Sequence, residues 1–245
     1  MDWAVDRDVF SFSHWYMPPS LFVPHLAESW DTPDPLTIIF NIRQGVYWQD
    51  KAPMNGRELT ADDVVFNFHR QLGLGDFAEA GPSPFTYERP PLGGSVTATD
   101  RYTVVIELAE PSSGALGQYL GIGLTYINPP EVIKEHGDMK DWRNLVGTGP
   151  YMLTDWTEGS SMTLQRNTDY WKDDEKYPGN RLPYIDEIQG LFIKEEATIL
   201  AGLRTAKIDF MGSTTGPPTS HRSKCSTASA RAIPKSCCSR GGAVP

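Results

Sequence analysis

The chain has 245 residues, of which 39% are hydrophobic and 11% aromatic, enough for one large domain or two small ones. Its formal net charge of −9 disfavours a broad surface for nucleic acid or for an anionic membrane. No run approaches the roughly 18 apolar residues that a membrane-spanning helix needs. The first residues contain neither the basic region nor the apolar core of a secretory signal, so we expect a cytoplasmic chain or one that lacks its natural beginning.

The carboxyl end of the chain differs in composition from the rest, because it is basic and contains the cysteines. Residues 214–245 contain five basic residues, no acidic residue and all three cysteines. They also offer too few large apolar side chains to offset the entropy of ordering. We therefore expect an acidic folded body followed by a disordered basic tail, or a reading-frame change near Gly212.

The first regular element expected is a strand. Apolar side chains occupy every second position of residues 36–43, which predicts a strand with one buried face. Residues 44–45 then suit a turn, and residues 46–48 resume an extended conformation.

A helix is expected to begin after Thr60, because Asp63 stands three residues later, where its carboxylate can accept from free backbone amides. Gly73 suits the carboxyl-terminal cap. The helical spacing predicts that Val64, Val65, Phe68 and Leu72 form an apolar stripe. It also predicts that Asp62, Asn67 and Arg70 face water.

Residues 73–94 are rich in glycine and proline and are expected to form a loop, and residues 102–108 alternate as a strand. Residues 147–150 predict a rigid turn that leads into a strand at 151–153. A partner strand is expected at 162–165, completing a hairpin.

The last elements expected in the body alternate in type. Residues 188–193 indicate a short buried strand, residues 195–207 a helix, and residues 208–210 another strand. This order implies a right-handed crossover between parallel strands. The fold class expected is therefore mixed α/β.

The sequence contains no recognisable motif for phosphate binding, metal binding or catalysis. The glycines around Thr148 lack the lysine of a phosphate-binding loop, and the five histidines include no pair at metal-binding helical spacing. No combination of nucleophile and base is recognisable. We expect no catalytic residue, no metal and no cofactor.

Seven short segments carry a family resemblance. They are LAESW at 26–30, FNIRQGV at 40–46, LTADDVV at 59–65, DRYTVV at 100–105, VGTGPY at 146–151, RNTDYW at 166–171 and KIDF at 207–210. Each alone is weakly specific, but together and in this order they resemble the bacterial extracellular solute-binding proteins of family 5, the peptide- and nickel-binding receptors of ABC importers.

The resemblance implies the amino-terminal half of a two-lobed periplasmic-binding-protein-like fold, with a small inserted α/β domain and with the second lobe missing. The divisions that it implies are a first-lobe segment at 1–44, the inserted domain at 45–143, a return to the first lobe at 144–213, and the tail at 214–245. The link at 51–59 is longer than the family's usual one.

The resemblance also implies a receptor for peptides or similar small solutes, with an ABC permease as partner of the intact protein. It implies a periplasmic or other extracytoplasmic location, with no membrane insertion and no nucleic acid. Tyr126 and Asn128 are candidate ligand contacts, because aromatic and amide groups suit peptide backbones. Thr148 is a third candidate. With half of the polar partners absent, we expect the chain alone to bind little.

Two other classes of function stay open. A ligand sensor or interaction module can have the same fold. A hydrolase that uses two of the 31 acidic residues is the less favoured alternative.

Overall fold

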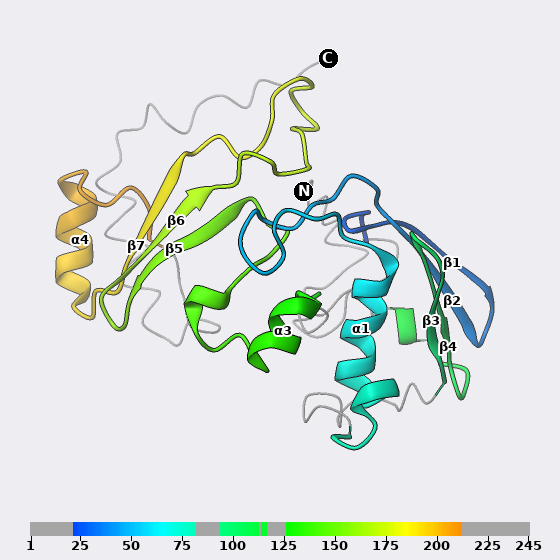
Figure 1. Ribbon diagram of the computed structural model, residues 1–245. Coiled ribbons are helices and arrows are strands. Elements are labelled where there is room, and N and C mark those ends of the chain that lie inside the picture. The colour runs from blue at the N-terminus through cyan, green and yellow to red at the C-terminus, as the bar shows by residue number, and fades with distance from the viewer. Residues whose placement is uncertain (1–21, 82–93, 113, 117–125, 212–245) are drawn as a thin grey trace, which may run out of the picture. The chain divides into compact units, whose positions relative to one another are not determined.

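The computed structural model describes residues 22–81, 94–112, 114–116 and 126–211. It divides into two compact units, residues 1–191 and 192–245, each described by itself. The elements of the first unit (Figure 1) are β1 (Ala27–Asp34), β2 (Thr37–Ile42), α1 (Ala61–Leu72), the 3-10 turn η2 (Gly75–Phe77), β3 (Val96–Asp100), β4 (Thr103–Glu107), α3 (Pro130–His136), the 3-10 turn η4 (Trp142–Asn144), β5 (Tyr151–Thr157), β6 (Ser161–Arg166) and β7 (Glu187–Leu191). The second unit contains α4 (Glu196–Arg204).

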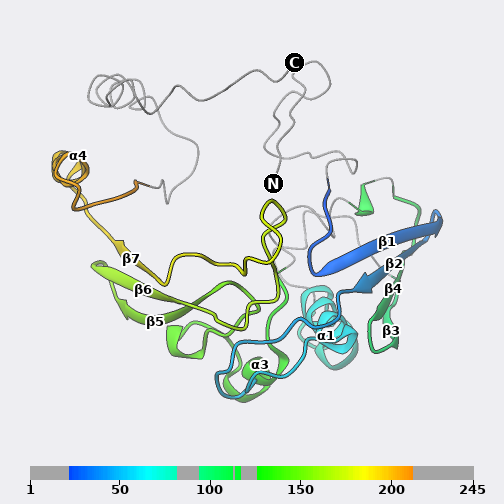
Figure 2. The same ribbon diagram turned by 90° about the horizontal axis from the view of Figure 1, so that it is seen from above.

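The first sheet has four antiparallel strands in the order β1-β2-β4-β3. The alternation predicted for residues 36–43 is confirmed, because every second side chain of β2 is buried. Helix α1 lies beside this sheet in both views (Figures 1 and 2), and its buried apolar side chains belong to the same core cluster. The strand residues of this core are between 0% and 4% exposed: Ile38, Phe40, Ile42, Val96, Val104 and Ile106.

Helix α1 begins and ends where the sequence predicts. The backbone N–H of Thr60 donates to the carboxylate of Asp63 at 3.0 Å. Gly73 ends the helix at a φ of 66°, a left-handed conformation that glycine adopts without strain. Val64 and Phe68 are each 5% exposed, as predicted for the apolar stripe, whereas Leu72, expected to be buried with them, is half-buried.

The prediction that Asn67 faces water is wrong, because this residue is 0% exposed. A single apolar stripe predicts one covered side of the helix. In the structure a second side of α1 also packs, against the segment that leads into α3, and Asn67 accepts hydrogen bonds there. Because asparagine is polar, the pattern of apolar residues did not predict that this side chain would be buried.

The second sheet has three antiparallel strands in the order β5-β6-β7. The hairpin of β5 and β6 is confirmed. The strand predicted at 188–193 exists as β7, but the prediction that it is buried is wrong, since its side chains alternate between exposed and half-buried. Among the described strands, β7 pairs only with β6.

The strand predicted at 208–210 is absent, and so is the parallel pair, because all strand pairs among the described residues are antiparallel. Three residues form a strand only where a neighbour supplies the ladder of hydrogen bonds. Phe210 is instead 81% exposed. The helix before this segment is confirmed as α4, although it is shorter than predicted.

The sequence pattern also missed β1, β3 and α3, which are short or strongly polar. The division into 1–44, 45–143 and 144–213 stays a prediction. Strand β2 pairs with β4, so the first sheet contains residues from both sides of the boundary expected after residue 44. The expected tail at 214–245 lies outside the described residues. Within the described part of the chain, no helix is long and apolar enough to cross a membrane.

Candidate functional site

The turn at 147–150 is held in place by the buried side chain of Gln49, which is 5% exposed. Its Oε1 accepts from the backbone N–H of Gly147 at 3.1 Å, and its Nε2 donates to the carbonyl of Tyr151 at 2.8 Å. The backbone N–H of Gln49 donates in turn to the carbonyl of Gly147 at 2.9 Å. One amide side chain therefore fixes both ends of the turn.

A second buried amide completes this arrangement. Nδ2 of Asn167, which is 5% exposed as a residue, donates to the carbonyl of Gly149 at 3.1 Å. Thr148 lies half-buried between the fixed positions. The structure thus presents this candidate ligand contact from a rigid turn, which is how preplaced polar groups lower the cost of binding.

The other two candidate contacts lie in the segment before α3. Asn128 donates through Nδ2 to Oδ1 of Asn67 at 2.9 Å, and through its backbone N–H to the same atom at 3.3 Å. Its amide is therefore already used to attach this segment to α1. Tyr126 is 73% exposed. The candidates thus belong to two different networks, and their role in binding stays a prediction.

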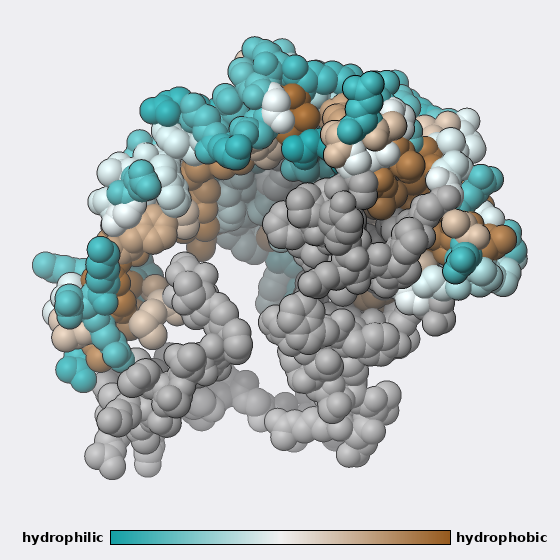
Figure 3. Space-filling view, turned by 90° about the horizontal axis from the view of Figure 1, so that it is seen from below, coloured by the Kyte–Doolittle hydropathy of each residue, from teal (hydrophilic) through white to brown (hydrophobic). Residues whose placement is uncertain are grey.

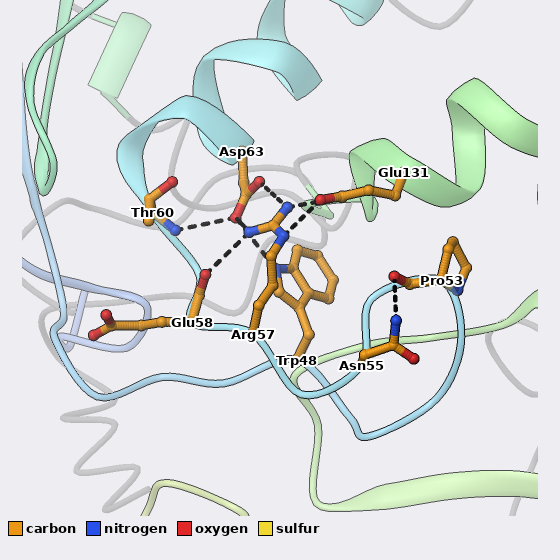
Figure 4. A network of polar contacts seen from close by, with 8 residues as sticks. All are labelled: Trp48, Pro53, Asn55, Arg57, Glu58, Thr60, Asp63 and Glu131. Atoms are coloured by element: carbon orange, nitrogen blue, oxygen red, sulfur yellow. Dashed lines mark hydrogen bonds and ion pairs between the residues drawn. The ribbon is translucent and has the colours of Figure 1, made fainter.

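Arg57 is the centre of a charged network that connects three segments (Figure 4). Its Nη2 donates to Oδ1 of Asp63 at 2.7 Å, and its Nε donates to Oε1 of Glu131 at 2.6 Å. The carboxylate of Asp63, which is 3% exposed as a residue, also accepts from the indole of Trp48 at 3.2 Å and from the backbone of Thr60. The guanidinium thus ties the loop at 49–59 to the first turns of α1 and α3.

The hydrogen bonds that Arg57 donates to Asp63 and, to a smaller extent, to Glu131 raise the pKa of Arg57 above its ordinary value. The hydrogen bond from Arg57 lowers the pKa of Glu131. Arg57, Asp63 and Glu131 all form ion pairs within this network, which indicates that the network stabilises the fold. The sequence pattern did not indicate the pairing of Arg57 with Glu131, which are 74 positions apart. The unusual length of the 51–59 link was the one feature of the sequence that set apart the loop containing Arg57.

The described surface has an open, mostly polar hollow of about 490 Å³ beside Trp171. The guanidinium of Arg43 lies over the Trp171 ring at 5.2 Å, and the ring of His25 meets the same indole edge-on at 5.1 Å. Burial, followed by the nearby charges of Lys172 and Arg43, lowers the pKa of His25. The residues that line the hollow are Pro24, Glu28, Arg43, Gln44, Gly45, Trp171, Lys172, Asp173 and Glu175.

The described residues include no group of three or more histidine, cysteine, aspartate or glutamate side chains that could hold a metal ion. What the geometry leaves accessible is a half-buried threonine on a fixed turn and an exposed tyrosine. A hydroxyl group can donate and accept hydrogen bonds, and an aromatic ring can stack.

Comparison with known proteins identifies the family. Residues 22–226 match the bacterial extracellular solute-binding proteins, family 5. The chain belongs to this family. It corresponds to part of the amino-terminal portion of its members, as the resemblance of the seven segments implied.

Several curated relatives are similar to the chain. The di/tripeptide-binding protein 1 of Pseudomonas aeruginosa (strain UCBPP-PA14) is 31% identical over 165 residues, which cover 62% of this chain and 30% of the relative. The periplasmic oligopeptide-binding protein OppA of Escherichia coli (strain K12) is 28% identical over 207 residues, covering 76% of this chain and 34% of the relative. The chain thus spans about a third of the length of the relatives that it matches.

Solved structures agree with this assignment. The periplasmic binding protein DppA of Helicobacter pylori, in complex with the peptide STSA, is 31% identical with a TM-score of 0.60, covering 76% of this chain and 37% of that one. AgaA from A. tumefaciens R10, in complex with agropinic acid, is 26% identical with a TM-score of 0.57, covering 76% and 34%. The expected fold class, mixed α/β and part of a periplasmic-binding-protein lobe, is confirmed.

Proposed function

We propose that this chain provides the amino-terminal portion of an extracytoplasmic receptor that captures a peptide-like solute and delivers it to an ABC permease. The observation that carries the proposal is the family match over residues 22–226, together with relatives named for the binding of dipeptides and oligopeptides. The periplasmic names of several relatives support the proposed location.

The solute class follows from the groups that the chain can offer. The turn around Thr148 is fixed by Gln49 and Asn167, and Tyr126 is open to solvent. Such groups suit a ligand with amide and carboxylate groups, as found in peptides. Agropinic acid in the AgaA complex indicates that relatives of this fold also accept other small polar solutes.

The role proposed is binding without catalysis. Members of the family are substrate-binding components of transporters. The charged network around Arg57 is fully paired, so it offers no free acid or base for a reaction. A peptidase assay on the purified chain tests this role directly, and turnover that persists through purification would contradict it.

Titration calorimetry with a pool of di- and tripeptides tests the receptor proposal. We expect no measurable binding by the chain alone, because the opposing wall of a binding cleft supplies many of a buried solute's partners. We expect binding by a chimera in which residues 1–211 are followed by the carboxyl-terminal portion of the P. aeruginosa di/tripeptide-binding protein 1.

Two variants of the chimera test the candidate contacts. Tyr126→Ala and Thr148→Val should each weaken binding, whereas Lys140→Met, which removes an exposed ion pair with Asp138, should not. Tight binding of peptide by the chain alone would contradict the proposal that it provides only one portion of the binding site. A folded chimera that binds none of the peptides would contradict peptides as the solute class.

A further inference from the structure

The link that precedes α1 forms a hairpin, residues 46–59, which we call the link hairpin. The backbone N–H of Trp48 donates to the carbonyl of Arg57 at 2.9 Å, and that of Leu59 donates to the carbonyl of Val46 at 2.8 Å. These bonds join the first arm of the hairpin, which contains Trp48, to the second arm, which contains Arg57.

Apolar side chains attach the link hairpin to the main core. Val46, Trp48, Met54 and Leu59 are each between 0% and 2% exposed and belong to the same core cluster as α1 and the first sheet. Met54 lies between the two arms, so both the base of the hairpin and its loop are anchored. A closely packed core resists displacement of such a segment as a whole.

Polar side chains that are buried, and not at the surface, surround the link hairpin. Hydrophilic residues, in teal, make up much of the described surface on the side drawn in Figure 3. Gln49, Asp63 and Asn67 are polar as well, yet they are only 5%, 3% and 0% exposed. Because a buried polar group without a partner costs free energy, the hydrogen bonds that these three side chains form are costly to break.

The first arm of the link hairpin holds the turn that carries Thr148. Gln49 forms hydrogen bonds with both ends of this turn, residues 147–151. Two positions after Gln49, Nζ of Lys51 donates to the carbonyl of Leu145 at 3.1 Å. The turn is therefore attached to the first arm at several points.

The second arm holds the segment that carries the other two candidate contacts, Tyr126 and Asn128. Nε of Arg57 donates to Oε1 of Glu131 at 2.6 Å (Figure 4), three positions after Asn128. Asn128 itself donates to Oδ1 of Asn67 on α1 at 2.9 Å. The second arm and α1 thus hold this segment at two nearby points.

We infer that the link hairpin positions the two candidate contact regions relative to each other, with Gln49 and Arg57 as the positioning residues. This inference rests on the proposed function. Gln49 directly follows Trp48, which is bonded to Arg57 across the hairpin, so a short and rigid path joins Thr148 to Tyr126. Groups that are held in place before a solute arrives lower the cost of binding it.

Backbone amide resonances of the 245-residue chain, measured by NMR, test the inference without a solute. Arg57→Leu should shift the amide resonance of Thr148, and Gln49→Met should shift that of Asn128, because the hairpin transmits a displacement from one arm to the other. Val104→Ala on β4, at a position that is 0% exposed, is the control for loss of stability alone. It should leave both resonances in place.

Peptide titration of the chimera described above tests the consequence for binding. Arg57→Leu and Gln49→Met should each weaken binding about three- to tenfold, although neither side chain is a candidate contact. The double variant should lose less than the product of the two single losses, because both substitutions break the same connection. Val104→Ala should bind peptide as tightly as the unmodified chimera.

Each outcome decides the inference in one direction. A Thr148 resonance that is unchanged in Arg57→Leu, or an Asn128 resonance that is unchanged in Gln49→Met, would overturn it. Losses of affinity that multiply independently, or an equal loss in Val104→Ala, would also overturn it. If Arg57→Leu does not fold, the response of Asn128 to Gln49→Met decides alone.

The two kinds of measurement separate this inference from the proposed function. A chimera that binds no peptide contradicts the peptide receptor, whereas the amide resonances of the chain alone still decide whether the hairpin joins the two regions. Peptide binding that is indifferent to both Gln49→Met and Arg57→Leu supports the receptor and overturns the positioning role.

Discussion

Arg57 joins its own loop to the start of α1, six positions on, and to the start of α3, 74 positions on. It pairs with Asp63 at the start of α1 and with Glu131 at the start of α3, and it donates through Nη1 to the carbonyl of Glu58. The Asp63 side chain is 4% exposed, whereas that of Arg57 is 34% exposed. Removing the cation would leave a buried carboxylate with only the donors of Trp48 and Thr60.

We therefore expect Arg57→Leu to lower the free energy of unfolding by about 2–3 kcal/mol, below the usual loss for a broken buried pair because Arg57 is partly solvated. Urea denaturation measures this change. Lys140→Met is the matched control, because its ion pair with Asp138 is exposed and its loss should leave the midpoint unchanged. Equal midpoints for Arg57→Leu and the wild type would contradict the structural role of the network.

The same network predicts a dependence of stability on pH. The hydrogen bond from Arg57 holds the pKa of Glu131 below its ordinary value of 4.5. A carboxyl with a lowered pKa in the folded state stabilises the fold above the unfolded pKa, and this contribution is lost as the pH falls through the folded pKa.

We expect the free energy of unfolding of the wild type to fall more steeply below about pH 4.5 than that of Glu131→Gln, which has no proton to gain. Urea titrations at a series of acidic pH values measure the difference between the two slopes. Parallel slopes would show that Glu131 is not held as a carboxylate by Arg57.

At the scale of elements, α1 depends on packing against the first sheet. Phe68 is 5% exposed and belongs to the main core, whereas Leu72 at the end of the helix is half-buried. Phe68→Ala should lower the free energy of unfolding by about 3–5 kcal/mol, because the surrounding core cannot close the cavity completely. Leu72→Ala should cost clearly less. Thermal and urea unfolding of both variants measure the order, and a reversed order would contradict the burial assigned to α1.

At the scale of the whole chain, the two sheets should differ in local stability. The first sheet shares a continuous core with α1, whereas the second sheet contains no buried residue. Local opening costs less free energy where few apolar side chains are buried. We expect backbone amides of β6 to exchange with solvent hydrogen faster than those of β2 and β4. Native-state hydrogen exchange measures this, and equal protection of the two sheets would contradict it.

Local patterns in the sequence determined β2, α1 and the β5–β6 hairpin, because period, capping and turn chemistry act within a few residues. The seven family segments determined the family in the same way, since each is a short run of neighbouring residues. The contact of Asn67 with Asn128 and that of Arg57 with Glu131 required the tertiary structure, because these partners lie 61 and 74 positions away. The strand expected at 208–210 failed for a related reason, since a strand exists only where another strand pairs with it. Whether an apolar side chain is buried was likewise decided by tertiary packing, because every second residue of β2 is buried whereas no residue of β6 is.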